Sequence, residues 1–194
     1  NSRIVCYPIR LLDSCPASDG ACAIVMASER KARKIARTPV WIKGLAYSGD
    51  EHWLGDDPRV PWQCAINAAQ AAYKMAGIDN PRRQLDYAEV YNPFTFQELL
   101  YYESFGFCEE GKAHELVEKG VVMRNGELPC DTSGGVLCTN PIGATGLLRV
   151  AEASMQIMGK AGAHQVHKPV RTALAHAMGG MDQLNGVMIL SSEL

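Results

Sequence analysis

Three short stretches of this 194-residue sequence carry side chains suited to proton transfer or to holding a negatively charged oxygen. They are VYNPF with Tyr91, TSGGVLCTNPIGATG with Asn140, and AHAMGG with His176. Histidine titrates near neutral pH, which makes His176 the best general acid or base among them. A tyrosine hydroxyl can donate a hydrogen bond to an oxyanion, whereas an asparagine amide only donates or accepts hydrogen bonds. Residues of these types indicate acid–base chemistry beside a developing oxyanion.

Glycines crowd the sequence around Asn140. Glycine is costly in ordered structure unless the backbone needs unusual dihedral angles or a close approach to another group. We therefore expect Gly134, Gly135, Gly143 and Gly146 to bring the backbone close to a pocket, where the N-terminus of the following helix polarises an anion. Cys138 lies two residues before Asn140, but nothing in the local sequence marks its thiol pKa as lowered. We interpret Cys138 as a small buried thiol.

The composition excludes several classes of function. Hydrophobic residues make up 47% and charged residues 21%, which is ordinary for a soluble globular protein. The formal net charge of -2 gives no reason to expect a nucleic acid or an anionic membrane as the partner. No apolar run approaches the roughly 18 residues that span a bilayer, and no secretory signal is present. We expect a cytoplasmic protein that binds neither nucleic acid nor membrane.

The seven cysteines are scattered and include no CxxC pair. An odd number of cysteines without metal-ligand spacing argues against both a disulfide framework and a zinc site. Reduced thiols in a cytoplasmic protein are the expected state. We therefore predict no metal site and no bound cofactor.

The hydrophobic pattern alternates between strand-like and helix-like segments. Apolar runs and alternation predict strands at 21–27, 40–49, 86–91, 170–180 and 186–192. Helical spacing and terminal glycines predict helices at 28–36, 61–76, 94–107, 111–119 and 144–159. A polar loop is expected at 51–61, and residues 1–20 are loop-like. This order of elements predicts a layered α/β domain with a mixed sheet.

The helix predicted at 144–159 has an unusual distribution of polar residues. Arg149, Glu152, Gln156 and Lys160 lie at steps of three and four, which makes a narrow polar stripe on an otherwise apolar cylinder. A helix of this kind is buried over most of its circumference. We expect it to lie inside the domain.

Four segments resemble the C-terminal half of the thiolase superfamily, in that family's order and spacing. They are DSCPASDGACAIVMASERKARKI, AEVYNPFTFQELLYYESFGF, SGGVLCTNPIGATGLLRVAEASMQIMGKAG and ALAHAMGGMDQ. The resemblance covers essentially all 194 residues and is closest to sterol-carrier-protein-type and archaeal acetoacetyl-CoA thiolases. It implies an α/β fold of βαβαβαββ order, with a mixed sheet and helices on both faces.

The resemblance also implies a missing part. Residues 1–194 correspond to a thiolase C-terminal domain, which packs on a similar N-terminal half and usually within a homodimer. The chain starts at Asn1 rather than at methionine, so we expect a fragment. Thiolases form an acyl-cysteine and make or break a carbon–carbon bond next to a CoA thioester. The nucleophilic cysteine lies in the N-terminal half, and coenzyme A is a substrate, not a bound cofactor.

Roles for this half follow from the resemblance, position by position. Tyr91 stands where related enzymes carry a histidine or an asparagine. Asn140 stands where most members have the histidine that activates the nucleophile, and archaeal-type enzymes are similar in having asparagine. His176 falls where common thiolases have a second cysteine that moves the α-proton. Gly179 and Gly180 would present backbone N–H groups to a thioester oxygen, while the glycines near Asn140 would approach the CoA substrate.

The departures at Tyr91 and Asn140 leave three functions open. The first is a thiolase-type acyltransferase acting on a 3-oxoacyl-CoA. The second is a thiolase-fold lyase that splits a 3-hydroxyacyl-CoA by retro-aldol chemistry, and some sterol-carrier-like relatives are similar in using a tyrosine this way. The third is a lipid-carrier or scaffold half without catalysis. Archaeal-type relatives often work beside a small OB-fold, zinc-ribbon protein, and the resemblance implies such a partner here.

Overall fold

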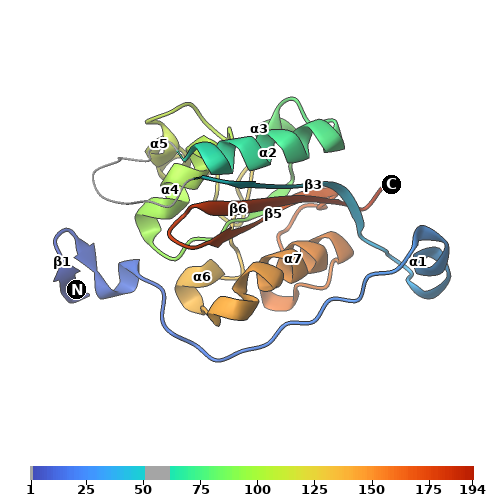
Figure 1. Cartoon of the computed structure of the whole chain (residues 1–194), viewed down its shortest axis with the longest axis horizontal. Helices are drawn as coiled ribbons and strands as arrows, with labels where there is room; N and C mark the ends of the chain where they lie inside the picture. Colours follow the sequence, from blue (N-terminus) through green and yellow to red (C-terminus); the bar gives the residue numbers. More distant parts are fainter. Residues whose placement is uncertain (1, 51–61) are drawn as a thin grey trace.

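A four-stranded mixed sheet forms the centre of the computed structural model, which describes residues 2–50 and 62–194 (Figure 1). The strands follow the order β3–β6–β5–β4, with bounds Trp41–Gly49 (β3), Leu184–Ser191 (β6), Thr172–Gly179 (β5) and Tyr87–Glu89 (β4). β6 pairs antiparallel with β3 and β5, whereas β4 pairs parallel with β5. Four of the five predicted strands are confirmed. The loop expected at 51–61 lies outside the described residues.

Helices cover both faces of the sheet (Figure 1). The helices on one side are α2 (Gln63–Ala76), α3 (Pro81–Gln84), α4 (Thr95–Ser104) and α5 (Ala113–Glu118). Those on the other side are α6 (Gly135–Cys138) and α7 (Ile142–Met158), with the short 3-10 helix η2 (Gly162–His164) after them. α2 contacts β3 and β6, and α7 contacts β4 and β5. The expected α/β class with helices on both faces is confirmed.

Alternation along β5 divides the interior into two hydrophobic cores. Leu174 packs with the core that includes the aromatic residues of α4, whereas Ala173 and Ala175 pack with Ala153 of α7. Successive side chains of a strand point to opposite faces of the sheet. His176, two residues after Leu174, therefore lies on the α4 side.

α2 buries the face that its residue spacing predicts. Ala65, Ala69, Ala72 and Tyr73 are all buried there. The helix ends at Gly77, whose φ of 70° places it in the left-handed conformation that commonly terminates a helix. This part of the sequence prediction is confirmed.

The apolar run at 21–27 is not a strand, so that prediction was wrong. Val25 and Met26 are 91% and 78% exposed, and no strand of the described chain pairs with the run. Figure 1 shows it as extended chain outside the layers, leading to α1 (Glu29–Ile35). A continuous apolar run becomes a strand when neighbours supply hydrogen bonds and cover both its faces. No element of the described chain does so here.

The first residues contain slightly more regular structure than expected. A short hairpin joins β1 (Ile4–Cys6) to β2 (Ile9–Arg10), and the 3-10 helix η1 (Leu11–Asp13) follows. The prediction of a loop over residues 1–20 holds for the remainder of the described segment.

The burial of α7 differs from the expectation at its start and along its polar stripe. Arg149 and Gln156 are 2% and 1% exposed, while Ile142 and Leu147 are 77% and 40% exposed. The polar stripe bonds to β4 and to the loop before α6. The residue spacing shows that the polar side chains form a stripe. It does not show which side of the helix is buried, because the burial of polar side chains depends on hydrogen-bond partners at the packing surface. The expectation that the apolar circumference is buried was wrong for the start of this helix.

Candidate active site

Tyr91 and Asn140 meet beyond the C-terminal end of β4. Tyr91 lies two residues after the strand, and Asn140 lies two residues before α7. The Tyr91 hydroxyl donates to Asn140 Oδ1 at 3.2 Å, and the Thr145 hydroxyl donates to the same oxygen at 2.8 Å. Tyr91 and Asn140 are both buried. The fold thus joins two of the three predicted loops in one hydrogen-bonded group.

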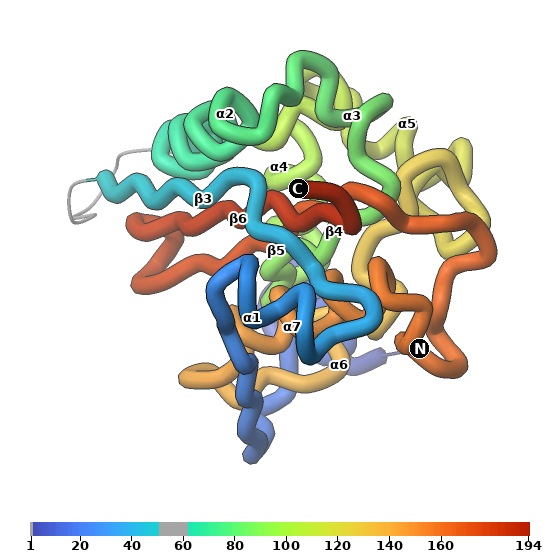
Figure 2. Tube along the Cα trace, turned by 90° about the vertical axis from the view of Figure 1, so that its right-hand side faces the viewer, coloured from blue at the N-terminus to red at the C-terminus, as the bar shows by residue number. Residues whose placement is uncertain are grey.

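A segment from the first twenty residues lies against this group. Asn140 Nδ2 donates to Cys15 Sγ at 3.1 Å, and the Asn140 backbone N–H donates to Ser18 Oγ at 3.2 Å. The Cys15 N–H donates to the Pro93 carbonyl at 2.8 Å. Figure 2 shows this N-terminal stretch running past α6 and α7. Cys15 therefore completes the surroundings of the Asn140 amide.

Sequence reasoning missed both Thr145 and Cys15 as neighbours of Asn140. Thr145 lies five residues after Asn140, about one turn into α7, and this spacing was the available signal. Cys15 lies in the DSCPASDG stretch, more than a hundred residues away in sequence, and no local pattern predicts its contact.

Burial is the main cause that raises the pKa of Tyr91 above its ordinary value. The neighbouring Thr145 hydroxyl and the positive charge of Arg149 act in the opposite direction, because both favour the phenolate. The phenol is therefore protonated at neutral pH and can donate to an oxyanion. Its phenolate, when formed, is a strong base. Tyr91 can thus either hold a negative oxygen or pass a proton.

His176 lies behind Tyr91, not beside its hydroxyl. Its Nδ1 accepts the Tyr91 backbone N–H at 3.1 Å, so Nε2 carries the proton and donates to Asn185 Oδ1 at 2.7 Å. The ring packs on Tyr101 and Phe105, with centroid distances of 4.3 and 4.9 Å. Burial lowers the pKa of His176 to about 3. The imidazole is therefore neutral at physiological pH, and both of its nitrogens are engaged.

The two glycines at the start of α6 bring the backbone close to another side chain. Gly134 and Gly135 have φ values of 93° and 61°, and a Cβ on Gly135 would lie 2.4 Å from Asn92 Oδ1. The same oxygen accepts the Val136 N–H at 2.7 Å. The close approach in the described chain is therefore to Asn92, which follows Tyr91 directly.

Three of the other predicted glycines lie away from this contact, and the fourth, Gly146, packs closely against Ala177 of β5. Gly143 is in the first turn of α7, and a Cβ there would meet no atom within 4 Å. Gly179 ends β5, and Gly180 begins the turn to β6 with a φ of 68°. The structure places Gly143 next to the Asn140 loop and the pair Gly179 and Gly180 at the hairpin.

Comparison with known proteins identifies the family. A family model described as "Thiolase C-terminal domain-like" matches residues 50–192. The chain belongs to the thiolase family. The resemblance carried by the three loops is thereby confirmed.

Curated relatives extend the similarity over nearly the whole chain. The acetyl-CoA acetyltransferase of Methanothermobacter thermautotrophicus is 34% identical, over 98% of this chain and 50% of that protein. The benzoylsuccinyl-CoA thiolase subunit BbsB of Thauera aromatica is 31% identical, over 93% of this chain and 47% of that protein. Human sterol carrier protein 2 is 32% identical, over 88% and 32% respectively. The chain therefore spans half or less of the length of these relatives.

A solved structure shares the fold of this thiolase chain. It is the "Ltp2-ChsH2(DUF35) aldolase", which matches over 98% of this chain and 49% of that chain, with a TM-score of 0.82 and 26% sequence identity. The thiolase-type fold described above is thus shared with a protein that is named an aldolase.

Cys138 of this thiolase chain is exposed, so the expectation of a buried thiol was wrong. It is the last residue of the four-residue helix α6, in which only Gly135 and Val136 are buried. Only the first two residues of this short helix are buried, and its last side chain is left exposed.

A cavity of about 540 Å³ lies between α4 and α5, behind the VYNPF loop. Asn92, Glu98 and Asp131 contribute its polar lining, with apolar side chains around them. Its size is within the usual range for ligand pockets, about 300–1,000 Å³. Neither Tyr91 nor Asn140 lines it. The cavity is therefore separate from the Tyr91–Asn140 pair.

Two further properties concern residues 2–50 and 62–194 of this thiolase chain. No group of three or more histidine, cysteine, aspartate or glutamate side chains in these ranges is arranged to hold a metal ion. No helix within them is both long and apolar enough to cross a membrane.

Proposed function

We propose that this chain is half of an enzyme that cleaves a 3-hydroxyacyl-CoA by a retro-aldol reaction. The observation that carries the proposal is the Tyr91–Asn140 pair, with 3.2 Å between the hydroxyl and the amide oxygen. It combines a proton-transfer group with an amide that can hold an oxyanion. His176 has both ring nitrogens engaged and supports the Tyr91 backbone instead.

In the proposed step, Tyr91 reacts in its ionised form, from which the phenol proton has passed to water, and the phenolate takes the proton of the substrate's 3-hydroxyl group. The C2–C3 bond breaks, C3 becomes a carbonyl carbon, and the electron pair passes to C2 and the thioester oxygen as an enolate. Asn140 Nδ2 turns from Cys15 to donate to the enolate oxygen. Tyr91 then returns the proton to C2. The products are a shortened acyl-CoA and an aldehyde or ketone, so atoms and charge balance without a cofactor.

The proposed function also requires parts of the protein that lie outside this chain. Relatives at least twice as long support an N-terminal half that packs on this one, and we propose a homodimer of the complete chain. The name of the similar aldolase joins two components, Ltp2 and ChsH2(DUF35), which supports a partner protein beside this chain as well. We propose that this partner is of the OB-fold, zinc-ribbon type. The loop glycines, together with Gly179 and Gly180, would then face the CoA substrate.

A second candidate is thiolytic acyl transfer on a 3-oxoacyl-CoA. It is favoured by the 34% identity to an acetyl-CoA acetyltransferase. It requires a cysteine nucleophile from the N-terminal half and a base for the α-proton. His176 could act as that base only by giving up its hydrogen bond to the Tyr91 N–H or to Asn185.

Product analysis of the complete assembly separates the candidates. The assembly is incubated with a 3-hydroxyacyl-CoA and, separately, with a 3-oxoacyl-CoA plus CoA. Retro-aldol cleavage yields a carbonyl product and no covalent adduct in the intact mass. An acyl adduct that disappears on adding CoA would support acyl transfer instead. Turnover of neither substrate would contradict both candidates and favour a non-catalytic carrier.

Tyr91→Phe should lower kcat for cleavage by about 10²–10⁴-fold, the usual contribution of a general acid or base. The ring and its packing remain, so the KM for the acyl-CoA should change little. Steady-state kinetics of the assembly measures both constants.

The matched control for this variant is Tyr73→Phe. It removes another buried tyrosine hydroxyl, which donates to the Phe105 carbonyl at 2.9 Å away from the site. Cleavage by Tyr73→Phe should stay within a few-fold of the unsubstituted protein. Full activity in Tyr91→Phe would contradict the proposed mechanism.

A further inference from the structure

The two ends of the Asn140 side-chain amide are held unequally. Its oxygen accepts two hydroxyl protons, from Thr145 at 2.8 Å and from Tyr91 at 3.2 Å. Its nitrogen donates to Cys15 Sγ at 3.1 Å, and sulfur is a weak acceptor. The oxygen end of the amide is therefore held by stronger hydrogen bonds than the nitrogen end.

The burial of Thr145 decides which way round this amide lies. Thr145 is fully buried, and its hydroxyl donates to Asn140 Oδ1. Exchanging the amide oxygen with the amide nitrogen would leave the protons of the Thr145 and Tyr91 hydroxyls without this acceptor. A buried donor that loses its partner pays the full cost of its desolvation. The Thr145 hydroxyl therefore keeps the amide oxygen toward α7 and the amide nitrogen toward the N-terminal segment.

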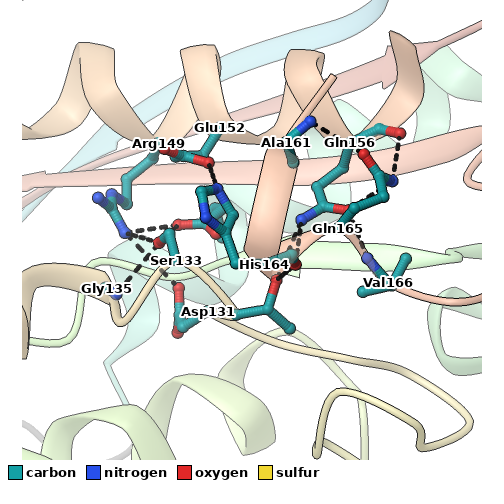
Figure 3. Close-up of polar contacts among 12 residues, drawn as sticks. Asp131, Ser133, Gly135, Arg149, Glu152, Gln156, Ala161, His164, Gln165 and Val166 are labelled. Carbon is teal, nitrogen blue, oxygen red and sulfur yellow. Dashed lines mark hydrogen bonds and ion pairs between the residues drawn. The ribbon is translucent and has the colours of Figure 1, made fainter. Parts of the chain in front are cut away.

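The remainder of α7 fixes the position of Thr145. Arg149, about one turn later, forms an ion pair with Glu89 at the end of β4, and both side chains are buried. Figure 3 shows the Arg149 guanidinium directed also at Ser133 in the loop before α6. Gln156, further along the helix, bonds to the same loop. These bonds oppose sliding and rotation of α7, so the Thr145 hydroxyl stays aligned with the Asn140 oxygen.

The direction of the amide decides what Asn140 does to a negatively charged oxygen. Its nitrogen can donate to such an oxygen, whereas its carbonyl oxygen can only repel it. A hydrogen bond to an anionic acceptor is roughly twice as strong as one between neutral groups. An oxyanion can therefore take the place of the weak acceptor Cys15 Sγ, provided that the nitrogen end of the amide faces it.

We propose that Thr145 is a positioning residue: its hydroxyl fixes the Asn140 amide so that Nδ2 faces the negatively charged oxygen of the reacting substrate. The inference rests on the proposed use of Asn140 to hold an oxyanion. A merely structural threonine would affect the binding of neutral and anionic ligands alike. The preference of the site for an anionic ligand is therefore the quantity to measure.

The experiment compares two unreactive thioethers of CoA on the complete assembly by isothermal titration calorimetry. S-carboxymethyl-CoA carries a carboxylate near the position of the thioester oxygen, and S-acetonyl-CoA carries a neutral ketone of similar size. The ratio of their Kd values measures the preference for the anion. Thr145→Val should lower this preference about fivefold, the usual effect of one lost hydrogen bond, while Thr145→Ser should retain it. An unchanged preference in Thr145→Val, or equal weakening of both ligands, would overturn the proposal.

A double-mutant cycle tests whether Thr145 acts through Asn140. Asn140→Ala removes the amide and should lower the preference for the anion about tenfold or more, because a hydrogen bond to a charged group is lost. Adding Thr145→Val to Asn140→Ala should then change the preference no further. A further loss of the same size as in the single variant would contradict the positioning role.

The matched control is Thr172→Val, which removes a threonine hydroxyl without changing the shape of the side chain. Thr172 begins β5, which runs parallel to β4, whereas Tyr91 follows the C-terminal end of β4. The substituted position therefore lies toward the opposite end of the sheet from the site. Thr172→Val should leave the preference unchanged, and a loss as large as that in Thr145→Val would contradict the proposal.

The binding of unreactive ligands is independent of turnover, so the two proposals fail separately. A preference that is lost in Thr145→Val, in an assembly that cleaves no 3-hydroxyacyl-CoA, would support the role of Thr145 and contradict the proposed reaction. Cleavage of the substrate with an unchanged preference in Thr145→Val would support the reaction and contradict the role of Thr145.

Discussion

At the scale of single residues, His176 shows how burial changes the chemistry of a side chain. An exposed imidazole exchanges protons near pH 6.5. Here the ring is enclosed by Tyr101 and Phe105, accepts the Tyr91 N–H and donates to Asn185. Desolvation therefore lowers its pKa to about 3. In the described geometry His176 bonds to the Tyr91 backbone, whereas the Tyr91 hydroxyl bonds to Asn140.

The lowered pKa of His176 predicts a loss of stability in acid. The folded-state pKa of about 3 lies below the ordinary value of 6.5, so the unfolded chain binds the proton more tightly. The contribution is complete above pH 6.5 and is lost as the pH falls from there toward 3. Between pH 7 and pH 5, this residue should lower the free energy of unfolding by about 2 kcal/mol.

Urea unfolding at the two pH values tests this prediction. The comparison is between the unsubstituted protein and His176→Gln, whose side chain does not titrate. Other groups titrate in both proteins, so only the difference between them reports on His176. An equal loss of stability on acidification in the two proteins would show that His176 is not held neutral.

At the scale of elements, α7 is packed closely against β5 at one point near its start. A Cβ at Gly146 would lie 2.7 Å from Ala177 Cβ, which is too close for two carbon atoms. Three residues earlier, a Cβ at Gly143 would meet nothing within 4 Å. Packing against β5 therefore requires glycine at position 146 but not at position 143, although both positions lie in the same glycine-rich motif of the sequence.

This contrast predicts opposite effects of the same substitution. Gly146→Ala should lower the free energy of unfolding by about 1–3 kcal/mol, because the added methyl group must separate α7 from β5. Gly143→Ala should raise it by about 0.5–1 kcal/mol, because alanine has the higher helix propensity. Thermal or urea unfolding of both variants measures the effects, and the same sign in both would contradict this account of the packing.

At the scale of the whole molecule, two segments of the described chain leave large apolar side chains exposed. The extended run at 21–27 exposes Val25 and Met26, and α7 exposes Ile142 and Leu147. Large apolar side chains exposed in this way typically mark an interface. Since the curated relatives are at least twice as long, we expect an N-terminal half like theirs to cover these side chains in the complete protein.

A charge placed in this surface should therefore weaken assembly. Val25→Lys should raise the Kd for the N-terminal half by about tenfold or more, because an unpaired ammonium group would be buried. Met75→Lys is the control, since Met75 is 63% exposed on α2, on the opposite side of the sheet from α7. Sedimentation of the mixed halves measures both values. Equal affinities of the two variants would show that the run at 21–27 lies outside the interface.

Much of the architecture follows from local pattern. The spacing of alanines in α2, the apolar alternation in β5 and β6, and the glycine that ends α2 specify their elements without reference to the rest of the chain. The motifs around Tyr91, Asn140 and His176 also indicate the family, which the matching family model confirms. These properties depend on contacts between residues close in sequence.

The sequence by itself determined the fold class, the family and the three loops in which chemistry was to be sought. The tertiary structure alone decided that Tyr91 bonds to Asn140, that His176 is neutral behind it, and that Arg149 is buried against Glu89. It also decided that the run at 21–27 is uncovered. The physical reason is that hydrogen-bond partners, burial and neighbouring charge depend on residues far apart in sequence, whose meeting no local spacing encodes.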